Sequence, residues 1–197
     1  MHQLVIASNN QGKIREIRPL INGMELLSLK DIGFIDEIPE PYHTFEENAL
    51  AKAITIQKFN GKNVMADDSG LCVNALGGEP GVESAHYCGE RNDEKNLQLV
   101  LEKLKGEADR TAYYKALICL IWEGEVYYFE GTCEGRIIDE KKGSGGFGYD
   151  PIFIPDGYEQ TFGELAPEVK NQISHRGKAI KKMVAWLNEK SGMNVEQ

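Results

Sequence analysis

The sequence of 197 residues carries a net charge of −9 and is 41% hydrophobic and 27% charged, an ordinary balance for one globular domain or two joined lobes. The negative charge argues against nucleic acid or an anionic membrane as the main partner, although a few clustered cations can still attract a phosphate compound. The sequence shows neither a signal-peptide pattern nor an apolar run of membrane-spanning length, so we expect a cytoplasmic protein. Its four cysteines lack C-x-x-C spacing, which argues against a zinc site and favours reduced thiols.

The first third of the chain alternates strand and helix patterns. Thr44 and Glu47 have the spacing of a capping box, which predicts that a helix begins there. Apolar residues at helical spacing, such as Ile14, Ile17 and Ile21, indicate an earlier helix. We expect, in order, a strand over residues 3–7, a helix over 11–21, a strand over 24–29, a loop over 31–43, a helix from Thr44 to about Phe59, and a strand over 63–68 that ends in two acids.

The rest of the chain predicts a hairpin followed by helices. Two β-rich stretches flank a turn at Glu123-Gly124, which is the pattern of a long hairpin. The full expectation is a turn-rich segment over 75–89, a helix over 93–104, hairpin strands over 111–122 and 125–138, a glycine-rich loop over 143–148, and helices over 167–173 and 176–190. Strand–helix units combined with a hairpin predict an α/β protein with a mixed sheet.

Two polar segments follow expected strands and are candidates for phosphate and metal chemistry. The first, Ser8 to Lys13, lies between a strand and a helix, where free backbone N–H groups and a lysine can attract phosphate; it is not a P-loop, and the alternative is an ordinary turn. The second is Asp67-Asp68-Ser69. Neighbouring side chains of a strand point to opposite faces, so the two aspartates are expected to differ in role, one holding Mg²⁺ or orienting a water. The alternative is a turn-forming acid pair.

Three further places carry weaker signals. Glu40 and Lys52 precede and follow the capping box, and each alone is typical of a solvated charge. The glycine-rich segment 143–151 contains Phe147, which could stack on a base, and Asp150, which could accept from a ring N–H; the alternative is a loop with one packed aromatic. Residues 174–178, with Lys170 upstream, concentrate donors, although for this segment alone a helix start with solvated charges is the better explanation. No Ser-His-Asp order, Cys-His pair or histidine cluster is convincing.

Six stretches taken together carry a family resemblance. They are Ser8-Asn9-Asn10-Gln11-Gly12-Lys13, Thr44-Phe45-Glu46-Glu47-Asn48-Ala49, Ala66-Asp67-Asp68-Ser69-Gly70-Leu71, residues 76–85 (LGGEPGVESA), Gly145-Gly146-Phe147-Gly148-Tyr149-Asp150-Pro151 and residues 173–179 (ISHRGKA). In this order and at this spacing the sequence resembles the inosine triphosphate pyrophosphatase family over nearly the whole chain. The visible departure is Ser8-Asn9, where the family more often has Thr-Gly or Thr-Asn; serine keeps the hydroxyl, so we expect little change.

The resemblance implies a fold, a reaction and a partner. The implied fold is a single nucleotide pyrophosphatase domain over 1–197, an elongated two-lobed α/β structure with a mixed twisted sheet, flanking helices and an active-site cleft between the lobes, usually a homodimer. The implied reaction cleaves deaminated purine triphosphates (ITP, dITP and XTP) between the α and β phosphates with Mg²⁺, which keeps deaminated bases out of nucleic acid. Its products are a nucleoside monophosphate and pyrophosphate.

The resemblance also assigns residues. Asp68 is implied as the catalytic residue and, with Glu40, as a metal ligand; Glu37 is a substitute for Glu40 because that loop aligns less firmly. The implied substrate contacts are Ser8, Asn9, Asn10, Gln11, Gly12, Lys13, Lys52, Ser69, Phe147, Gly148, Tyr149, Asp150, Lys170, His175 and Arg176. Donors such as His175 and Arg176 would favour a purine 6-carbonyl over the 6-amino group of adenine. The rival functions are another phosphotransfer enzyme, such as a kinase, and a nucleotide sensor without turnover.

Overall fold

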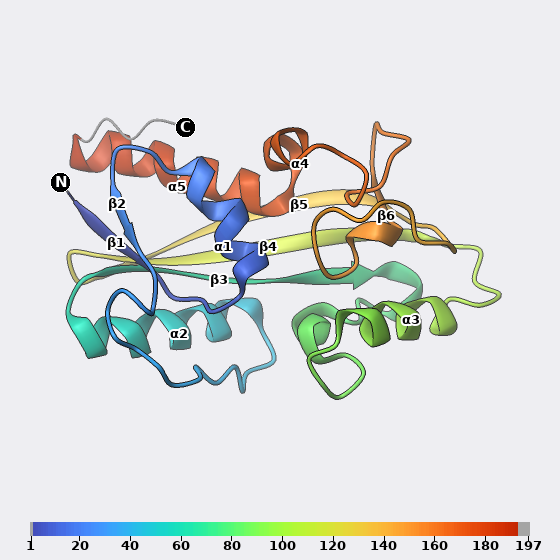
Figure 1. Ribbon diagram of the computed structural model, residues 1–197, viewed down its shortest axis with the longest axis horizontal. Helices are drawn as coiled ribbons and strands as arrows, with labels where there is room; N and C mark the ends of the chain where they lie inside the picture. Colours follow the sequence, from blue (N-terminus) through green and yellow to red (C-terminus); the bar gives the residue numbers. More distant parts are fainter. Residues whose placement is uncertain (1, 193–197) are drawn as a thin grey trace. The chain divides into compact units, whose positions relative to one another are not determined.

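The computed structural model describes residues 2–192 of the chain (Figure 1). Helices and strands alternate at first, and a long hairpin and two helices follow. The main elements are β1 (Gln3–Ile6), α1 (Gln11–Ile17), β2 (Glu25–Leu27), α2 (Phe45–Asn60), β3 (Asn63–Val73), α3 (Asp93–Lys103), β4 (Thr111–Trp122), β5 (Glu125–Ile137), β6 (Phe153–Pro155), α4 (Pro167–Ile173) and α5 (His175–Ser191). Within the described residues no helix is both long and apolar enough to cross a bilayer.

The strands form one mixed six-stranded sheet in the order β2-β1-β3-β4-β5-β6. β1 pairs in parallel with β2 and β3, whereas β5 and β6 pair antiparallel. The sheet and its flanking helices confirm the α/β class and the mixed sheet predicted from the sequence. The chain divides into two compact units: unit 1 contains residues 1–68, 116–131 and 176–197, and unit 2 contains 69–115 and 132–175. The boundary therefore falls inside β3, between Asp68 and Ser69.

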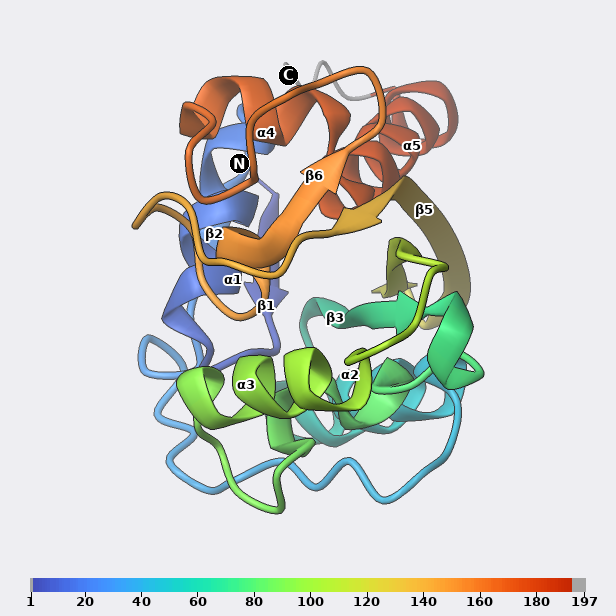
Figure 2. The same ribbon diagram turned by 90° about the vertical axis from the view of Figure 1, so that its right-hand side faces the viewer.

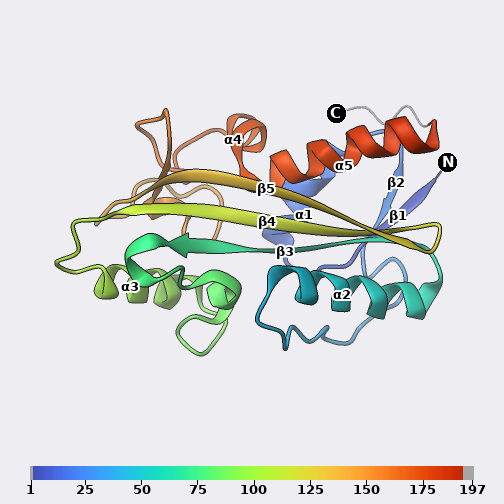
Figure 3. The same cartoon turned by 180° about the vertical axis from the view of Figure 1, so that it is seen from behind.

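In unit 1 the sheet is covered on both faces. Leu4 and Ile6 of β1 pack in one apolar cluster with residues of α1 and α5, while Val5 packs in a second cluster with α2. The same alternation continues along β4, where Ile118 belongs to the first cluster and Cys119 to the second. Figures 1 and 3 show α1 and α5 on one side of these strands and α2 on the other. Continuous apolar strands are expected where both faces are buried.

In unit 2 one apolar cluster joins α3, the strand segments and the 149–162 region. Its fully buried members include Val100 of α3, Phe153 of β6 and Phe162, and Tyr114 of β4 packs edge-on against Phe153 with ring centroids 4.8 Å apart. α3 lies on one side of the strands of this unit and α4 on the other (Figures 1 and 2). Edge-to-face aromatic packing of this kind adds to the apolar burial.

Most element predictions hold, with three differences. Thr44 caps α2 as predicted, because its Oγ1 accepts a hydrogen bond from Glu47 N at 3.1 Å. The first helix ends earlier than expected, since Pro19 lies in a 3₁₀ turn (Arg18–Leu20) that follows α1. β6 was not predicted, because a strand of three residues that includes Pro155 gives little pattern.

The third difference concerns β3, which passes through Asp67 and Asp68 and does not end there. The strand continues because Leu71 and Val73 are buried in unit 2 and because Leu71 N donates to Ser84 Oγ at 2.9 Å. Gly70 permits this contact: a Cβ atom there would lie 2.1 Å from the carbonyl oxygen of Gly81. The acids therefore lie inside a strand rather than at its carboxyl end.

Candidate active site

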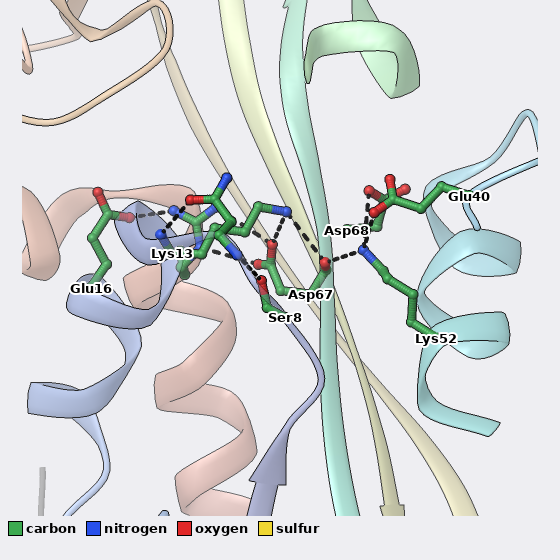
Figure 4. Close-up of polar contacts among 9 residues, drawn as sticks. Ser8, Lys13, Glu16, Glu40, Lys52, Asp67 and Asp68 are labelled. Carbon is green, nitrogen blue, oxygen red and sulfur yellow. Dashed lines mark hydrogen bonds and ion pairs between the residues drawn. The ribbon is translucent and has the colours of Figure 1, made fainter. Parts of the chain in front are cut away.

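Asp67 and Asp68 point to opposite faces of β3 (Figure 4). The Asp67 carboxylate meets Lys13 of α1, with 2.7 Å between Asp67 Oδ1 and Lys13 Nζ. Asp68 lies on the α2 side, where its Oδ1 is 3.8 Å from Lys52 Nζ. The division follows from the period of two along a strand: Met65 packs in the cluster with α1 and α5, and Ala66 in the cluster with α2. The predicted difference between the two acids is thus built into the strand.

Lys13 and Lys52 come from different helices and converge on one atom. Lys52 Nζ donates to the main-chain oxygen of Asp67 at 2.7 Å, and Lys13 Nζ donates to the same oxygen at 3.3 Å. β1 ends at Ile6, and just after it Ala7 N donates to Met65 O of β3, two residues before Asp67. Two positive charges are therefore held beside β3 at the place where its parallel neighbour leaves the sheet.

On the α1 side, the cations are matched by carboxylates. Arg176, only 2% exposed, donates from Nε to Asp67 Oδ2 at 3.2 Å and from Nη1 to Glu16 of α1. Burial alone would raise the pKa of Asp67, but Arg176 and Lys13 outweigh it and hold that pKa well below its usual range. Burial lowers the pKa of Lys13, and the Asp67 carboxylate opposes this shift. Two cations and two carboxylates make this side close to neutral.

On the α2 side, the carboxylates are in excess. Lys52 is the cation there, and it donates to Glu40 Oε1 at 3.0 Å while lying near Asp68. Burial raises the pKa of Asp68 to about 6, with Glu40 adding to the rise and Lys52 opposing it. Asp68 Oδ2 is buried and has no hydrogen-bond partner among the residues that the structure describes. A buried carboxylate oxygen in this state needs a further ligand or a proton.

This donor set fits a divalent cation. Mg²⁺ is usually held by one or two carboxylates together with waters and substrate phosphates, so a full cage of side chains is not required. In the described part of the chain no three His, Cys, Asp or Glu side chains gather as a metal site. Asp68 and Glu40 supply the two carboxylates, and the excess negative charge on their side of β3 favours a cation. Glu37 and Glu40 both lie in exposed positions of this loop, but it is Glu40 that pairs with Lys52.

The 8–13 segment leads from β1 into α1 and positions Lys13. Asn10 caps the helix, since its Oδ1 accepts from Lys13 N at 3.1 Å, and Asn10 N donates to Ser8 Oγ at 3.1 Å. These two side chains fix the turn, which directs Lys13 toward β3 (Figure 4). Gly12 is buried, while Asn9 and Gln11 are exposed. Lys13 lies three residues after the cap residue Asn10, about one helical turn, and so is on the side of α1 that faces β3.

The candidate base contacts of unit 2 gather around Asp150. Lys170 Nζ pairs with Asp150 Oδ2 at 2.6 Å, and Phe147 N donates to the same oxygen at 3.0 Å. Tyr114 Oη donates to Oδ1 at 3.1 Å, and the Tyr114 ring stacks on His175 with centroids 4.6 Å apart. A Cβ atom at Gly146 would come within 2.0 Å of the carboxylate, which explains one glycine of this loop. A direct bond from Asp150 to a base stays a prediction.

The remaining predicted residues are placed as follows. Phe147 is half-buried with Lys170 Nζ 5.3 Å from its ring centroid, and Tyr149 is buried and donates from Oη to Ser84 O at 2.6 Å. Gly148 N donates to Asp93 Oδ2 at 3.0 Å, and Ser69 follows Asp68 in β3. The guanidinium of Arg176 is bound to carboxylates of unit 1, so a contact between Arg176 and a base likewise stays a prediction.

Sequence reasoning missed two residues of these networks. Glu16 pairs with Arg176. It lies three residues after Lys13 on the same helix, and because residues at that spacing share a helix face, this spacing could have indicated that Glu16 lies near the site. Tyr114 supports both Asp150 and His175, but nothing in its strand distinguishes it from neighbouring aromatic residues. Its role depends on contacts with residues far along the chain.

Paired lysines beside paired carboxylates in an α/β sheet are groups that could hold a polyanion together with a cation. The chain belongs to the Ham1 family, which it matches over residues 4–186. A dITP/XTP pyrophosphatase of Christiangramia forsetii is 46% identical over 189 residues, covering 95% of this chain and 100% of that protein. A dITP/XTP pyrophosphatase of Bacillus subtilis is 45% identical over 193 residues, covering 95% and 98%.

A solved structure agrees with these relatives. The Ham1 protein of Staphylococcus aureus superposes with a TM-score of 0.86 at 42% identity, covering 95% of this chain and 98% of that one. The family resemblance inferred from the six sequence stretches is therefore confirmed, as is the α/β fold with a mixed sheet.

Proposed function

We propose that this protein hydrolyses deaminated purine nucleoside triphosphates (ITP, dITP and XTP) to the monophosphate and pyrophosphate, and so removes them from the nucleotide pool. The observation that carries the proposal is the meeting, within unit 1, of two lysines and two carboxylates at the middle of β3. The relatives named dITP/XTP pyrophosphatase, which align over almost the whole chain, support the substrate class.

The lysines of unit 1 are suited to bind the triphosphate. Lys13 and Lys52 hold their ammonium groups beside one main-chain oxygen, and both side chains are largely removed from solvent, with 13% and 6% exposed. Charge interactions are stronger there than in bulk water, and fixed cations need little reorganisation as charge moves to the leaving pyrophosphate. The lysines would therefore stabilise the transition state more than flexible surface charges could.

Asp68 is the residue that acts on the attacking water in this proposal. The water oxygen forms a bond to the α phosphorus, the bond from that phosphorus to the α–β bridging oxygen breaks, and pyrophosphate leaves with the electron pair. The Asp68 carboxylate accepts the hydrogen bond of the water and orients it; one proton of the water stays on the new monophosphate oxygen, and the other passes to Asp68 and from there to solvent. Without a metal the pKa of this carboxyl is about 6, and a bound divalent cation would lower it, so orienting the water is the larger part of the role of Asp68.

Asp68 and Glu40 would hold Mg²⁺, and the ion would supply charge neutralisation on the phosphate oxygens. The base contacts that the family resemblance implies would recognise the purine: Phe147 offers a stacking surface, and donors such as His175 match the 6-carbonyl of hypoxanthine or xanthine but not the amino group of adenine. A homodimer, which the family resemblance implies, and a cytoplasmic location, which the sequence pattern favours, belong to the same proposal.

Product analysis tests the proposed function. The purified protein is incubated with dITP, XTP, ITP, dGTP and ATP, with Mg²⁺ or with a chelator, and the products are identified by ³¹P NMR. We expect pyrophosphate and a monophosphate from dITP, XTP and ITP with Mg²⁺, and at least a hundredfold slower turnover by Asp68→Asn. Asp36→Asn, at an exposed loop position, is the control. Release of orthophosphate, transfer of phosphate to an acceptor, or binding without turnover would overturn the proposal.

A further inference from the structure

Asp67 belongs to the site by position, but the chemistry proposed above leaves it without a role. Its side chain is 1% exposed and lies on the α1 side of β3, across the strand from Asp68 and Glu40 (Figure 4). Both carboxylate oxygens meet cations: Oδ1 is 2.7 Å from Lys13 Nζ, and Oδ2 is 3.2 Å from Arg176 Nε. A divalent cation would be repelled by these two groups, so the position is unsuited to metal binding.

Residue 67 holds the lysines through two different groups. The carboxylate binds Lys13, and the main-chain oxygen accepts from Lys13 at 3.3 Å and from Lys52 at 2.7 Å. The oxygen is fixed in the sheet, whereas a lysine side chain has four rotatable bonds and loses rotamer entropy when it is ordered. Anchoring the ammonium group before the substrate arrives removes that loss from the binding step.

Asp67 is itself held in place. Arg176 contacts its carboxylate with Nε and Nη2, and the other side of the guanidinium binds Glu16. Glu16 and Lys13 lie three residues apart on α1, so this helix contributes one residue to each end of the chain of charges. The sequence of contacts is Glu16, Arg176, Asp67, Lys13, and it ends at the ammonium group proposed to meet the triphosphate.

We propose that Asp67 is a positioning residue, which fixes the ammonium group of Lys13 for the triphosphate and takes no part in metal binding. The inference rests on the proposed function, because it assigns Lys13 to the triphosphate. It differs from a purely structural role for Asp67 in one respect: the effect of changing Asp67 must pass through Lys13.

A double-mutant cycle tests the inference. The four proteins are the wild type, Asp67→Asn, Lys13→Met and the double variant, measured for kcat and KM with dITP and for the affinity of tripolyphosphate in the presence of a chelator. We expect Asp67→Asn to lower kcat/KM and tripolyphosphate affinity by about tenfold or more, and to leave the Mg²⁺ concentration for half-maximal rate unchanged within about twofold. In the Lys13→Met background the same change should have less than about a twofold effect.

Because Asp67→Asn leaves the buried charge of Arg176 less compensated and can destabilise the fold, Asp67→Glu is the second variant. It keeps the charge but moves the carboxylate by one methylene, so we expect a smaller loss that also disappears in the Lys13→Met background. The inference would be overturned if an Asp67 substitution lowered kcat/KM by the same factor in the Lys13→Met background as in the wild type. It would also be overturned if the substitution changed the Mg²⁺ concentration needed for half-maximal rate. A wild type that binds tripolyphosphate but does not hydrolyse dITP would instead contradict the proposed function, while the binding cycle would still test Asp67.

Discussion

Lys52 and Asp68 form a loose ion pair: Lys52 Nζ lies 3.8 Å from Asp68 Oδ1 and closer to two other oxygens, at 2.7 Å and 3.0 Å. The lysine therefore compensates the buried charge of Asp68 only in part. The other carboxylate oxygen of Asp68 is buried without a hydrogen-bond partner among the described residues. Burial accordingly raises the pKa of this carboxyl to about 6, which has consequences for both stability and metal binding.

Replacing Asp68 with Asn should stabilise the metal-free protein. The folded state binds the Asp68 proton more tightly than the unfolded state, so ionisation of this group lowers the free energy of unfolding as the pH rises from about 4 to about 6. At pH 7 to 8 the full penalty is present, and we expect Asp68→Asn to raise the free energy of unfolding by about 1–3 kcal/mol. Urea titrations in a chelator at several pH values measure the effect.

The pH dependence of that gain is the decisive part. It should shrink toward zero below about pH 4, where Asp68 is protonated in both states. Asp36→Asn, at an exposed position, should be neutral throughout. A destabilised Asp68→Asn protein at pH 7.5, or a gain that does not change with pH, would show that the charge of Asp68 is well compensated.

Replacing Glu40 with Gln should raise the Mg²⁺ requirement. Gln keeps the size of the side chain but removes the charge that, beside Asp68, leaves this side of β3 with excess carboxylates. We expect the Mg²⁺ concentration for half-maximal dITP hydrolysis to rise at least about tenfold. Glu37→Gln is the matched control from the same loop and should behave as the wild type; the reverse result would assign the metal to Glu37.

The buried pair of Lys170 and Asp150 should be sensitive to loss of one partner. Lys170→Met would leave a carboxylate that is 4% exposed without its cation, and we expect a loss of about 3–5 kcal/mol in the free energy of unfolding. Lys170→Met combined with Asp150→Asn should recover most of it. The exposed pair of Lys95 and Glu90 supplies the control, since Lys95→Met should change stability by less than about 1 kcal/mol. If Lys170→Met and Lys95→Met lowered the free energy of unfolding equally, the buried pair would contribute no more to stability than the exposed pair, contrary to this prediction.

Gly70 is expected to tolerate no side chain. A Cβ atom there would lie 2.1 Å from the backbone oxygen of Gly81, which cannot move without displacing the 81–86 turn, so Gly70→Ala should lower the free energy of unfolding by about 2–4 kcal/mol. Gly77 is the comparison, because its φ is +65° with nothing within 4 Å; Gly77→Ala should lose only about 1–2 kcal/mol. Thermal unfolding of both variants would show whether the close approach at Gly70 is real.

The sequence predicts the helices and the hairpin well because their signals are local. The Thr44 capping box and the turn at Glu123-Gly124 each place an element boundary without knowledge of the fold. β3 was predicted to end at its acids, because Asp-Asp-Ser-Gly resembles a turn. It continues because Ser84, fourteen residues after Gly70, supplies a hydrogen bond to the strand, and a partner of that kind leaves no periodic pattern in the sequence.

Nearly all residues of the candidate site were named from the sequence, but the sequence did not say which of them lie together on each face of β3. Strand periodicity predicts that Asp67 and Asp68 point apart, which the structure agrees with. It does not say which helix covers which face, so the pairing of Asp67 with Lys13 and of Glu40 with Lys52 required the fold. Arg176 was predicted as a donor to the substrate, with a solvated charge at a helix start as the alternative; the alternative is wrong, because Arg176 is buried by its ion pairs.

The separation of work between Asp67 and Asp68 is tested most directly by metal binding to the free protein. Mn²⁺, as a paramagnetic substitute for Mg²⁺, is titrated into the wild type, Asp68→Asn and Asp67→Asn, and the free ion is followed by electron paramagnetic resonance. We expect Asp68→Asn to weaken binding by at least about tenfold and Asp67→Asn to stay within about threefold of the wild type. Normal binding by Asp68→Asn, or an equal loss in Asp67→Asn, would contradict the account.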